Sequence, residues 1–494
     1  MTAYEELENR FKDLSVLYQV STILHWDAAV TMPAGGAEAR AEQMAAMAAI
    51  QHARLTDPAI GELLDQAASS DLNEWQQANL HEMRRNYTRS TSVPADLVDA
   101  LSRAGSACEH TWRDAKKNDD YATVLPLLQT LVDLTRQEAA ALADSLHVSP
   151  YDALLDGYEP DARIADIEPI FDAYAGFLPD VLDDILDRQT SAGAPVVPQV
   201  GFPVEKQKQL ARELAETAGF DFERGRMDVS AHPFSTGYAG DRRITTGYHE
   251  DDPGFAIMAV LHETGHSIYE QNLPEKWRYQ PVGQARGMQL HESQSLLVEM
   301  QACRSDAFLS YLSPKLIGAF GDDPAFAQDN LRKRYRRVAR SFIRVDADEA
   351  TYPIHVILRT RLERAILSGD LPLADLPGAW SDGLYELLGI RPPDDRQGCL
   401  QDIHWYSGGF GYFPTYTLGA MTAAQLFQTA TAADPSIVPG LEAGDFAPLR
   451  SWLKENVHQY GSRYSTAEVL SKATGRPLDP ASFQSHIRTR YLAV

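Results

Sequence analysis

Features that are scarce or missing in this sequence of 494 residues exclude several classes of protein. The only cysteines are Cys108, Cys303 and Cys399, with no C-x-x-C pair, which excludes a disulfide framework and a thiolate metal cluster. No apolar run approaches the roughly 18 residues that a membrane span needs, and the N-terminus lacks the basic and apolar regions of a secretory signal. We therefore expect a cytoplasmic protein with no membrane partner.

Positive charge is also in short supply. The chain has 45 basic and 69 acidic residues, which gives a formal net charge of −24. A protein with this charge repels polyanions, so we expect no nucleic-acid partner. The hydrophobic content of 44% is nevertheless ordinary for a folded globular chain.

Most of the sequence follows the apolar period of α-helices. In the N-terminal part, the pattern predicts helices over 3–24, 37–52, 71–86 and 95–117, the last one with Ser92 as a cap and Pro94 in the first turn. The proline- and glycine-containing stretch 191–203 is the best candidate boundary. A β-like pattern over 227–249 predicts a small hairpin or sheet. We expect a mainly α fold in a single domain over 1–494, with an N-terminal helical lobe (1–190) and a second lobe (204–494).

The strongest chemical signal is the motif H-E-x-x-H at residues 262–266. It lies on a predicted helix over 255–269 that Asp252 and Pro253 open. On such a helix His262 and His266 project from one face, where both imidazoles can reach one Zn²⁺ ion. Glu263 lies beside them and could take a proton from a water on the metal without being a ligand.

A catalytic zinc site needs a third protein ligand, and Glu292 is the leading candidate. It lies on a second helix-like stretch, 289–299, so two helices would supply two histidines and one glutamate. Glu270 and Glu299 are weaker candidates for the same place. We expect His291 to support the site or simply to be buried.

Six motifs in a fixed order make the chain resemble the Taq-type metallocarboxypeptidases, also known as family M32 or the thermostable carboxypeptidase 1 family. The motifs are HPF at 232–234, DRRIT at 241–245, HETGH at 262–266, HESQ at 291–294, IRVDAD at 343–348 and GCLQDIHW at 398–405. The resemblance implies a helical fold with a deep active-site groove and a small β-sheet near the zinc. It also implies a homodimer and the removal of C-terminal residues from peptides with broad specificity. The expected metal is Zn²⁺, with Co²⁺ able to serve.

Residues that could bind the substrate follow from this activity. An exopeptidase acting at C-termini needs a cation for the substrate carboxylate, and we predict Arg344 in this role because a guanidinium binds a carboxylate through two hydrogen bonds. His232, His404 and Tyr412 are candidates for stabilising the oxyanion. Arg344 closes a basic run from Arg332 that we interpret as a salt-bridged helix face or a positive wall of the groove.

Neighbouring residues have a simpler expected role: Asp241, Arg243, Asp346 and Asp348 are predicted to form a scaffold or to orient the ligand histidines. Two rival functions stay open at this point. The first is a zinc endopeptidase or dipeptidyl carboxypeptidase of related fold, and the second is a non-catalytic binding protein that keeps the metal as a structural staple. The presence of Glu263 favours catalysis, because a staple has no use for a base.

Overall fold

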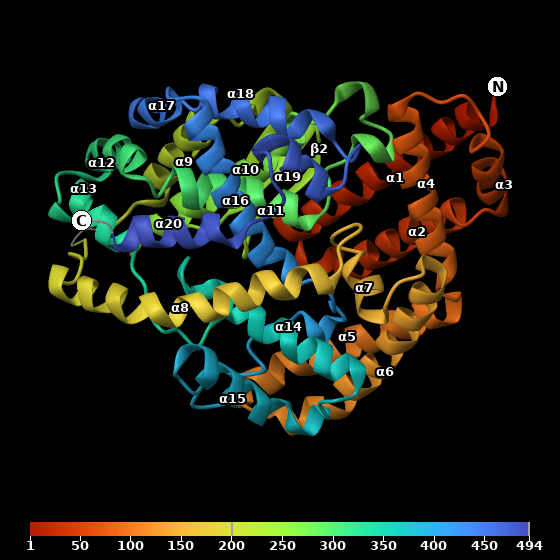
Figure 1. Cartoon of the computed structure of the whole chain (residues 1–494), viewed down its shortest axis with the longest axis horizontal. Helices are drawn as coiled ribbons and strands as arrows, with labels where there is room; N and C mark the ends of the chain where they lie inside the picture. The colour runs from red at the N-terminus through yellow and green to blue at the C-terminus, as the bar shows by residue number, and fades with distance from the viewer. Residues whose placement is uncertain (199–200, 493–494) are drawn as a thin grey trace. The chain divides into compact units, whose positions relative to one another are not determined.

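The computed structural model describes residues 1–198 and 201–492 and is mainly α-helical (Figure 1). By packing, the chain divides into two compact units. Unit 1 comprises Met1–Ser90, Pro195–Tyr335 and Thr422–Leu478; unit 2 comprises Thr91–Ala194, Arg336–Met421 and the segment from Asp479 onward. The chain passes from unit 2 to unit 1 between Ala194 and Pro195, inside the predicted boundary at 191–203. Two other passages between the units lie inside helices, α4 (Glu74–Ser92) and α16 (Pro414–Ala433). The two compact units therefore have boundaries that differ from those of the expected lobes.

Unit 1 carries the H-E-x-x-H motif. Besides parts of α4 and α16, its α-helices are α1 (Ala3–Val30), α2 (Ala37–Leu55), α3 (Pro58–Ala67), α9 (Val204–Ala218), α10 (Pro253–Gln271), α11 (Met288–Leu296), α12 (Asp306–Phe320), α13 (Gln328–Tyr335), α17 (Ile437–Ala443), α18 (Ala447–Asn456) and α19 (Thr466–Thr474). Helix α1 begins with a capping box, in which Thr2 and Glu5 satisfy each other's backbone N–H groups. It continues six residues past the predicted end at residue 24, up to the turn before Pro33.

Unit 2 carries the predicted substrate-binding residues Arg344, His404 and Tyr412. Its helices are α5 (Ala95–Asn118), α6 (Tyr121–Leu146), α7 (Pro150–Leu155), α8 (Ile164–Ala192), α14 (Tyr352–Ser368), α15 (Leu376–Leu388) and α20 (Pro480–Leu492). Helix α5 begins directly after Pro94, which is its N-cap residue, whereas Ser92 is the last residue of α4. The cap that we predicted for Ser92 is therefore wrong, because the preceding helix continues up to it.

The three strands of unit 1 form one small sheet in the order β1-β3-β2. Strand β1 (Gly225–Val229) runs parallel to β3 (Asp241–Thr246), with Gly225 opposite Arg242, and β2 (Phe234–Tyr238) runs antiparallel to β3, with Phe234 opposite Thr245. This confirms the β-like pattern of 227–249, and of the two predicted alternatives, a hairpin or a small sheet, the chain forms the sheet.

The sheet and the histidine helix share one apolar cluster. Ala211 and Ala215 on α9, Ile244 on β3 and Val260 on α10 are fully buried and pack together with Phe220. The sheet thus packs against α10, the helix of the metal motif, as predicted. Among the residues that the structure describes, no helix is both long and apolar enough to cross a membrane.

Candidate metal centre

Helix α10 presents the two histidines of the motif. Asp252 caps the helix by accepting a hydrogen bond from Gly254 N–H at 2.7 Å, and Pro253 occupies the first turn, where its missing N–H is tolerated. His262 and His266, four residues apart, lie one turn from each other, with ring centroids 5.0 Å apart. The sequence signals for this helix are thus confirmed at its start and at its spacing.

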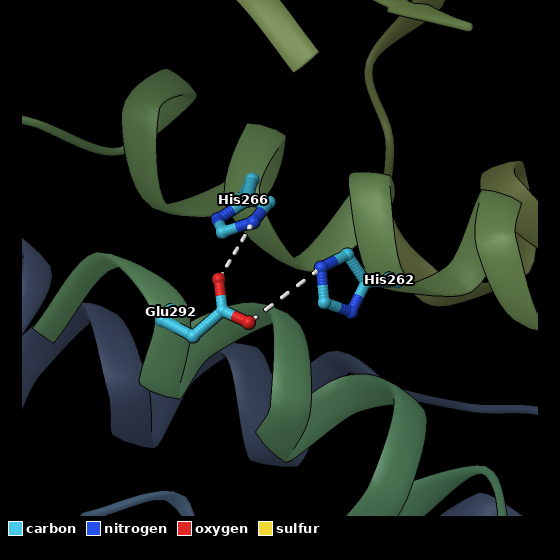
Figure 2. A group of neighbouring side chains, drawn as sticks. All are labelled: His262, His266 and Glu292. Atoms are coloured by element: carbon cyan, nitrogen blue, oxygen red, sulfur yellow. Dashed lines mark ion pairs between the residues drawn. The ribbon is translucent and has the colours of Figure 1, made fainter. Parts of the chain in front are cut away.

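Glu292 reaches the two histidines from α11. Its carboxylate oxygens lie 4.0 Å from Nε2 of His262 and 3.5 Å from Nε2 of His266, and one donor atom from each residue falls within 4.8 Å of the others. Figure 2 shows the carboxylate pointing up from one helix between the two imidazoles of the other. Donors that bind one ion tetrahedrally at about 2.1 Å lie roughly 3.4 Å from each other. The spacing of these side chains therefore fits a single small divalent cation.

A glycine between the two histidines allows α10 and α11 to come close. A Cβ atom added to Gly265 would lie 2.5 Å from the carbonyl oxygen of Gln294 and 2.6 Å from Cα of Ser295. Side chains larger than hydrogen cannot fit there without moving the backbone of α11. Gly265 thus allows the helix that carries Glu292 to pack directly on the histidine helix.

The protonation of the cluster depends on its burial and its charges. Burial lowers the pKa of His266 to about 4, which leaves the imidazole neutral, as a metal ligand must be. Burial opposes protonation of His262, but the hydrogen bond with Glu299 and the charge of Glu292 outweigh it and raise the pKa of His262 to about 10. A cation must displace that proton from His262 before it can bind.

The pKa values of Glu292 and Glu263 are shifted in opposite directions. Burial opposes ionisation of Glu292, yet the contact with His266 and the charge of His262 lower its pKa to about 2, so this ligand is an anion. Glu263 is buried, and the loss of solvent raises its pKa to about 7, against the opposing charge of His262. A carboxyl group with a pKa near neutral can both accept and release a proton in a catalytic cycle.

The weaker candidates for the third ligand occupy other places. Glu299 accepts a hydrogen bond from Nδ1 of His262 at 2.9 Å, on the side of the ring away from Glu292. Glu270 contacts Nε2 of His291 at 3.0 Å, and Nδ1 of His291 lies 2.7 Å from Nδ1 of His266. Glu299 therefore contacts the Nδ1 side of His262, and Glu270 contacts His291.

Arg344, in unit 2, is buried and already has an ionic partner. Its Nη2 donates to Asp402 at 2.8 Å, its Nη1 donates to the hydroxyl of Tyr352 at 3.3 Å, and the side chain is 8% exposed. Asp402 also accepts from Nε of Arg359 at 2.6 Å. Since two guanidinium groups share one carboxylate, this cluster keeps an excess positive charge that an anionic group could neutralise.

The three oxyanion candidates fall in two different surroundings. His232 follows β1 in unit 1, and its side chain is exposed. His404 and Tyr412 stack on each other in unit 2, with ring centroids 5.7 Å apart. Nε2 of His404 lies 3.4 Å from the hydroxyl of Tyr416, and its buried Nδ1 has no hydrogen-bond partner among the described residues. Burial lowers the pKa of His404 to about 4, so the ring is neutral.

The basic run from Arg332 to Arg344 does not form the predicted helix. Helix α13 ends at Tyr335, and the chain from 336 to 343 is irregular. The arginines are paired one by one: Arg332 with Asp306, Arg334 with Asp252, and Arg340 with Asp183 and the carbonyl of Leu388. The predicted helix face is therefore wrong, because the helix ends at Tyr335, whereas the predicted salt bridges are present, each with a separate partner.

The residues predicted as scaffold are partly as expected. Asp241 and Arg243 form a pair with two contacts, at 3.0 and 2.7 Å. Asp348 accepts hydrogen bonds from the backbone N–H groups of Ala350 and Thr351 at the start of α14. None of these contacts reaches a ligand histidine.

Two features of the site were not predicted from the sequence: the role of Gly265, which stands at a spacer position of the motif, and the contact of Glu299 with His262. One signal was available for Glu299: it follows Glu292 by seven residues, which is nearly two helical turns, so both acids share one helix face.

Comparison with known proteins agrees with the motifs. The family model described as carboxypeptidase Taq (M32) metallopeptidase matches residues 6–491. Thermostable carboxypeptidase 1 of Thermus thermophilus is 36% identical over 100% of this chain and 99% of its own length, and carboxypeptidase 1 of Bacillus subtilis is 33% identical over 99% and 98%. Metallocarboxypeptidase 1 of Trypanosoma cruzi has a similar structure, with a TM-score of 0.97 and 38% identity over 99% of both chains.

These relatives are named carboxypeptidases, and the match extends over nearly the whole chain, well beyond the six motifs between residues 232 and 405. The chain therefore belongs to the carboxypeptidase Taq (M32) family and is a metallocarboxypeptidase, a peptide hydrolase that depends on a divalent metal ion.

Proposed function

We propose that this chain releases C-terminal amino acids from peptides with broad specificity and that it uses one zinc ion held by His262, His266 and Glu292. The supporting observation is the convergence of these side chains from two helices within 4.8 Å, beside the buried Glu263. Two imidazoles and one carboxylate are a typical catalytic zinc set, because they leave a position for water or substrate. Cobalt, which accepts the same ligands, is the alternative metal.

Glu263 is the proposed general base. When bound, the ion would polarise the scissile carbonyl group and lower the pKa of a water molecule. Because burial raises the pKa of Glu263 to about 7, its carboxylate takes a proton from the attacking water near neutral pH. The same carboxyl group then gives this proton to the leaving amine.

Arg344 is proposed to bind the C-terminal carboxylate of the substrate. The support is the excess positive charge that Arg344 and Arg359 keep after pairing with Asp402. A buried guanidinium offers a planar pair of donors that matches a carboxylate, and this distinguishes an exopeptidase from an endopeptidase. The orphan Nδ1 of His404 and the stacked Tyr412 favour this pair over the exposed His232 as oxyanion donors.

Glu263→Gln tests the base, and an amidated peptide tests the exopeptidase assignment. The purified protein is incubated with a peptide and with its C-terminally amidated form, with and without a chelator, and products are identified by mass spectrometry. We expect stepwise loss of C-terminal residues from the free peptide only, and no turnover by Glu263→Gln with its zinc content unchanged. Glu250→Gln, an exposed acid of unit 1, serves as the matched control. Efficient cleavage of the amidated peptide would instead identify an endopeptidase.

The homodimer implied by the resemblance is also a proposal. Sedimentation equilibrium of the purified chain measures the mass directly, and a species of one chain's mass at all concentrations would reject it.

A further inference from the structure

Each proposed ligand histidine has a second ring nitrogen that faces away from Glu292. A histidine that binds a metal through Nε2 must carry its proton on Nδ1, so the partner of Nδ1 decides whether Nε2 has a free lone pair. The structure gives the two histidines different partners, and both sets lie within unit 1.

Behind His262 the partner is an anion held by an arginine. Glu299 accepts from Nδ1 of His262 at 2.9 Å, and its other oxygen accepts from Nη2 of Arg304 at 2.6 Å. Glu299 is 8% exposed and lies in a π-helical turn, Leu297–Ala302, that continues α11. Such turns interrupt α-helices frequently at functional sites. One helix and its extension thus supply both Glu292 and the acid behind His262.

Behind His266 the partner is a third histidine. Nδ1 of His266 lies 2.7 Å from Nδ1 of His291 and 3.1 Å from the backbone carbonyl oxygen of His291. Nε2 of His291 lies 3.0 Å from Glu270, whose carboxylate is 3.8 Å from Arg242. One assignment of protons satisfies both hydrogen bonds: His266 Nδ1–H donates to Nδ1 of His291, and His291 Nε2–H donates to Glu270.

We propose that Glu299 and His291 are positioning residues that fix the metal-binding tautomers of His262 and His266, and that Glu299 carries the larger share. The inference depends on the proposed metal ligands. His262 has Glu299 as its only Nδ1 partner within the described part of the chain, so removal of this carboxylate leaves the proton without an acceptor. His266 keeps the carbonyl oxygen of His291 even when the imidazole of His291 is removed.

The amide analogue of Glu299 separates orientation from packing. In Glu299→Gln the side chain keeps its size but has only one carbonyl oxygen for two donors, His262 and Arg304. If the oxygen faces Arg304, the amide N–H₂ faces His262 and favours the tautomer with the proton on Nε2, which cannot bind a cation. If the oxygen faces His262, the N–H₂ is forced against Arg304. A purely space-filling role predicts no effect of this change.

The zinc affinities of the full-length variants test the proposal by chelator competition, and the visible spectrum of the cobalt-loaded protein reports ligand geometry. We expect a loss of zinc affinity of about 10- to 100-fold for Glu299→Ala and a clear loss for Glu299→Gln, with altered cobalt bands. The expected loss for His291→Ala is less than about tenfold. Glu82→Gln is the control: it removes the charge of another buried acid in the same unit, the partner of Arg286, and should leave zinc affinity unchanged.

The outcomes distinguish this inference from the proposed ligand set. His262→Ala must abolish tight zinc binding; if it does not, the ligand set itself is wrong. If His262→Ala loses zinc while both Glu299 variants bind it like the wild type, or if His291→Ala loses more affinity than Glu299→Ala, only the positioning roles are rejected.

Discussion

The close packing of α10 on α11 at Gly265 makes Gly265→Ala a sensitive test of the metal centre. In an exposed helix, replacing glycine by alanine stabilises by about 0.5 to 1 kcal/mol, because alanine loses less backbone entropy. At Gly265 the new methyl group would lie 2.5 Å from the carbonyl oxygen of Gln294, whereas ordinary van der Waals contact begins at 3.4 Å. The backbones of the two helices must therefore separate locally by roughly 0.9 Å.

This separation has two measurable consequences. Overpacking a filled interior destabilises by about 1 to 3 kcal/mol, so the substitution should lower the free energy of unfolding instead of raising it. Glu292 lies on the displaced helix, and metal–ligand distances tolerate only about 0.2 Å. We expect zinc affinity to fall by at least about tenfold and kcat/KM to fall on the order of 10²-fold.

Chelator competition measures the zinc affinity, and urea unfolding of the metal-free protein measures the stability. Gly318→Ala is the matched control, since Gly318 lies in α12 of the same unit and an added Cβ there meets no atom within 4 Å. It should be neutral or slightly stabilising and should bind zinc normally. If Gly265→Ala is as stable as Gly318→Ala and binds zinc with unchanged affinity, the close approach of the helices does not position Glu292, and the reasoning fails.

Three further predictions concern charge and pH. Because the pKa of His262 is raised to about 10, zinc must displace its proton, and zinc affinity should rise about tenfold per pH unit between roughly pH 7 and 9. Titration calorimetry in buffers of different ionisation enthalpy should count about one released proton per zinc ion, and a zinc affinity that does not change with pH would contradict this. Arg344→Lys should reduce the preference for a free over an amidated C-terminus about 10- to 100-fold in kcat/KM, and an unchanged ratio would remove Arg344 from carboxylate binding. Burial raises the pKa of Glu363 from 4.5 to about 7, so between these pH values the folded protein holds a proton that the unfolded chain releases. The free energy of unfolding should therefore fall as the pH rises from about 4.5 to about 7. Urea unfolding at pH 5 and pH 8 should show a smaller difference in this free energy for Glu363→Gln than for the wild type.

Local signals in the sequence were sufficient for the histidine helix. Asp252 and Pro253 mark its start, and the four-residue spacing of His262 and His266 places two imidazoles on one face. Both features depend on neighbouring residues only, so no tertiary information is needed. The β pattern near Ile244 and Thr245 could be read for the same reason.

Choices among residues on one face depended on tertiary contacts. Periodicity places Glu292 and Glu299 on the same side of α11 and its π turn, but only the packing against α10 decides which acid lies between the histidines. The predicted helix face of the basic run was wrong for a related reason. The long side chains of Arg332, Arg334 and Arg340 pair with separate acids that lie far away in the sequence. Neither outcome is encoded in local spacing.

Helix α10 has very little surface of its own, since most of its residues, among them Ile257, Leu261, Thr264 and Ile268, are buried. A helix that is enclosed on nearly all sides holds its side chains in fixed rotamers. Almost every change along α10 would therefore alter the interior of unit 1 together with the ligand geometry. The same holds for α11 and the π turn after it, whose residues are also mostly buried, so a change of metal preference would need several coordinated substitutions in the interior of unit 1.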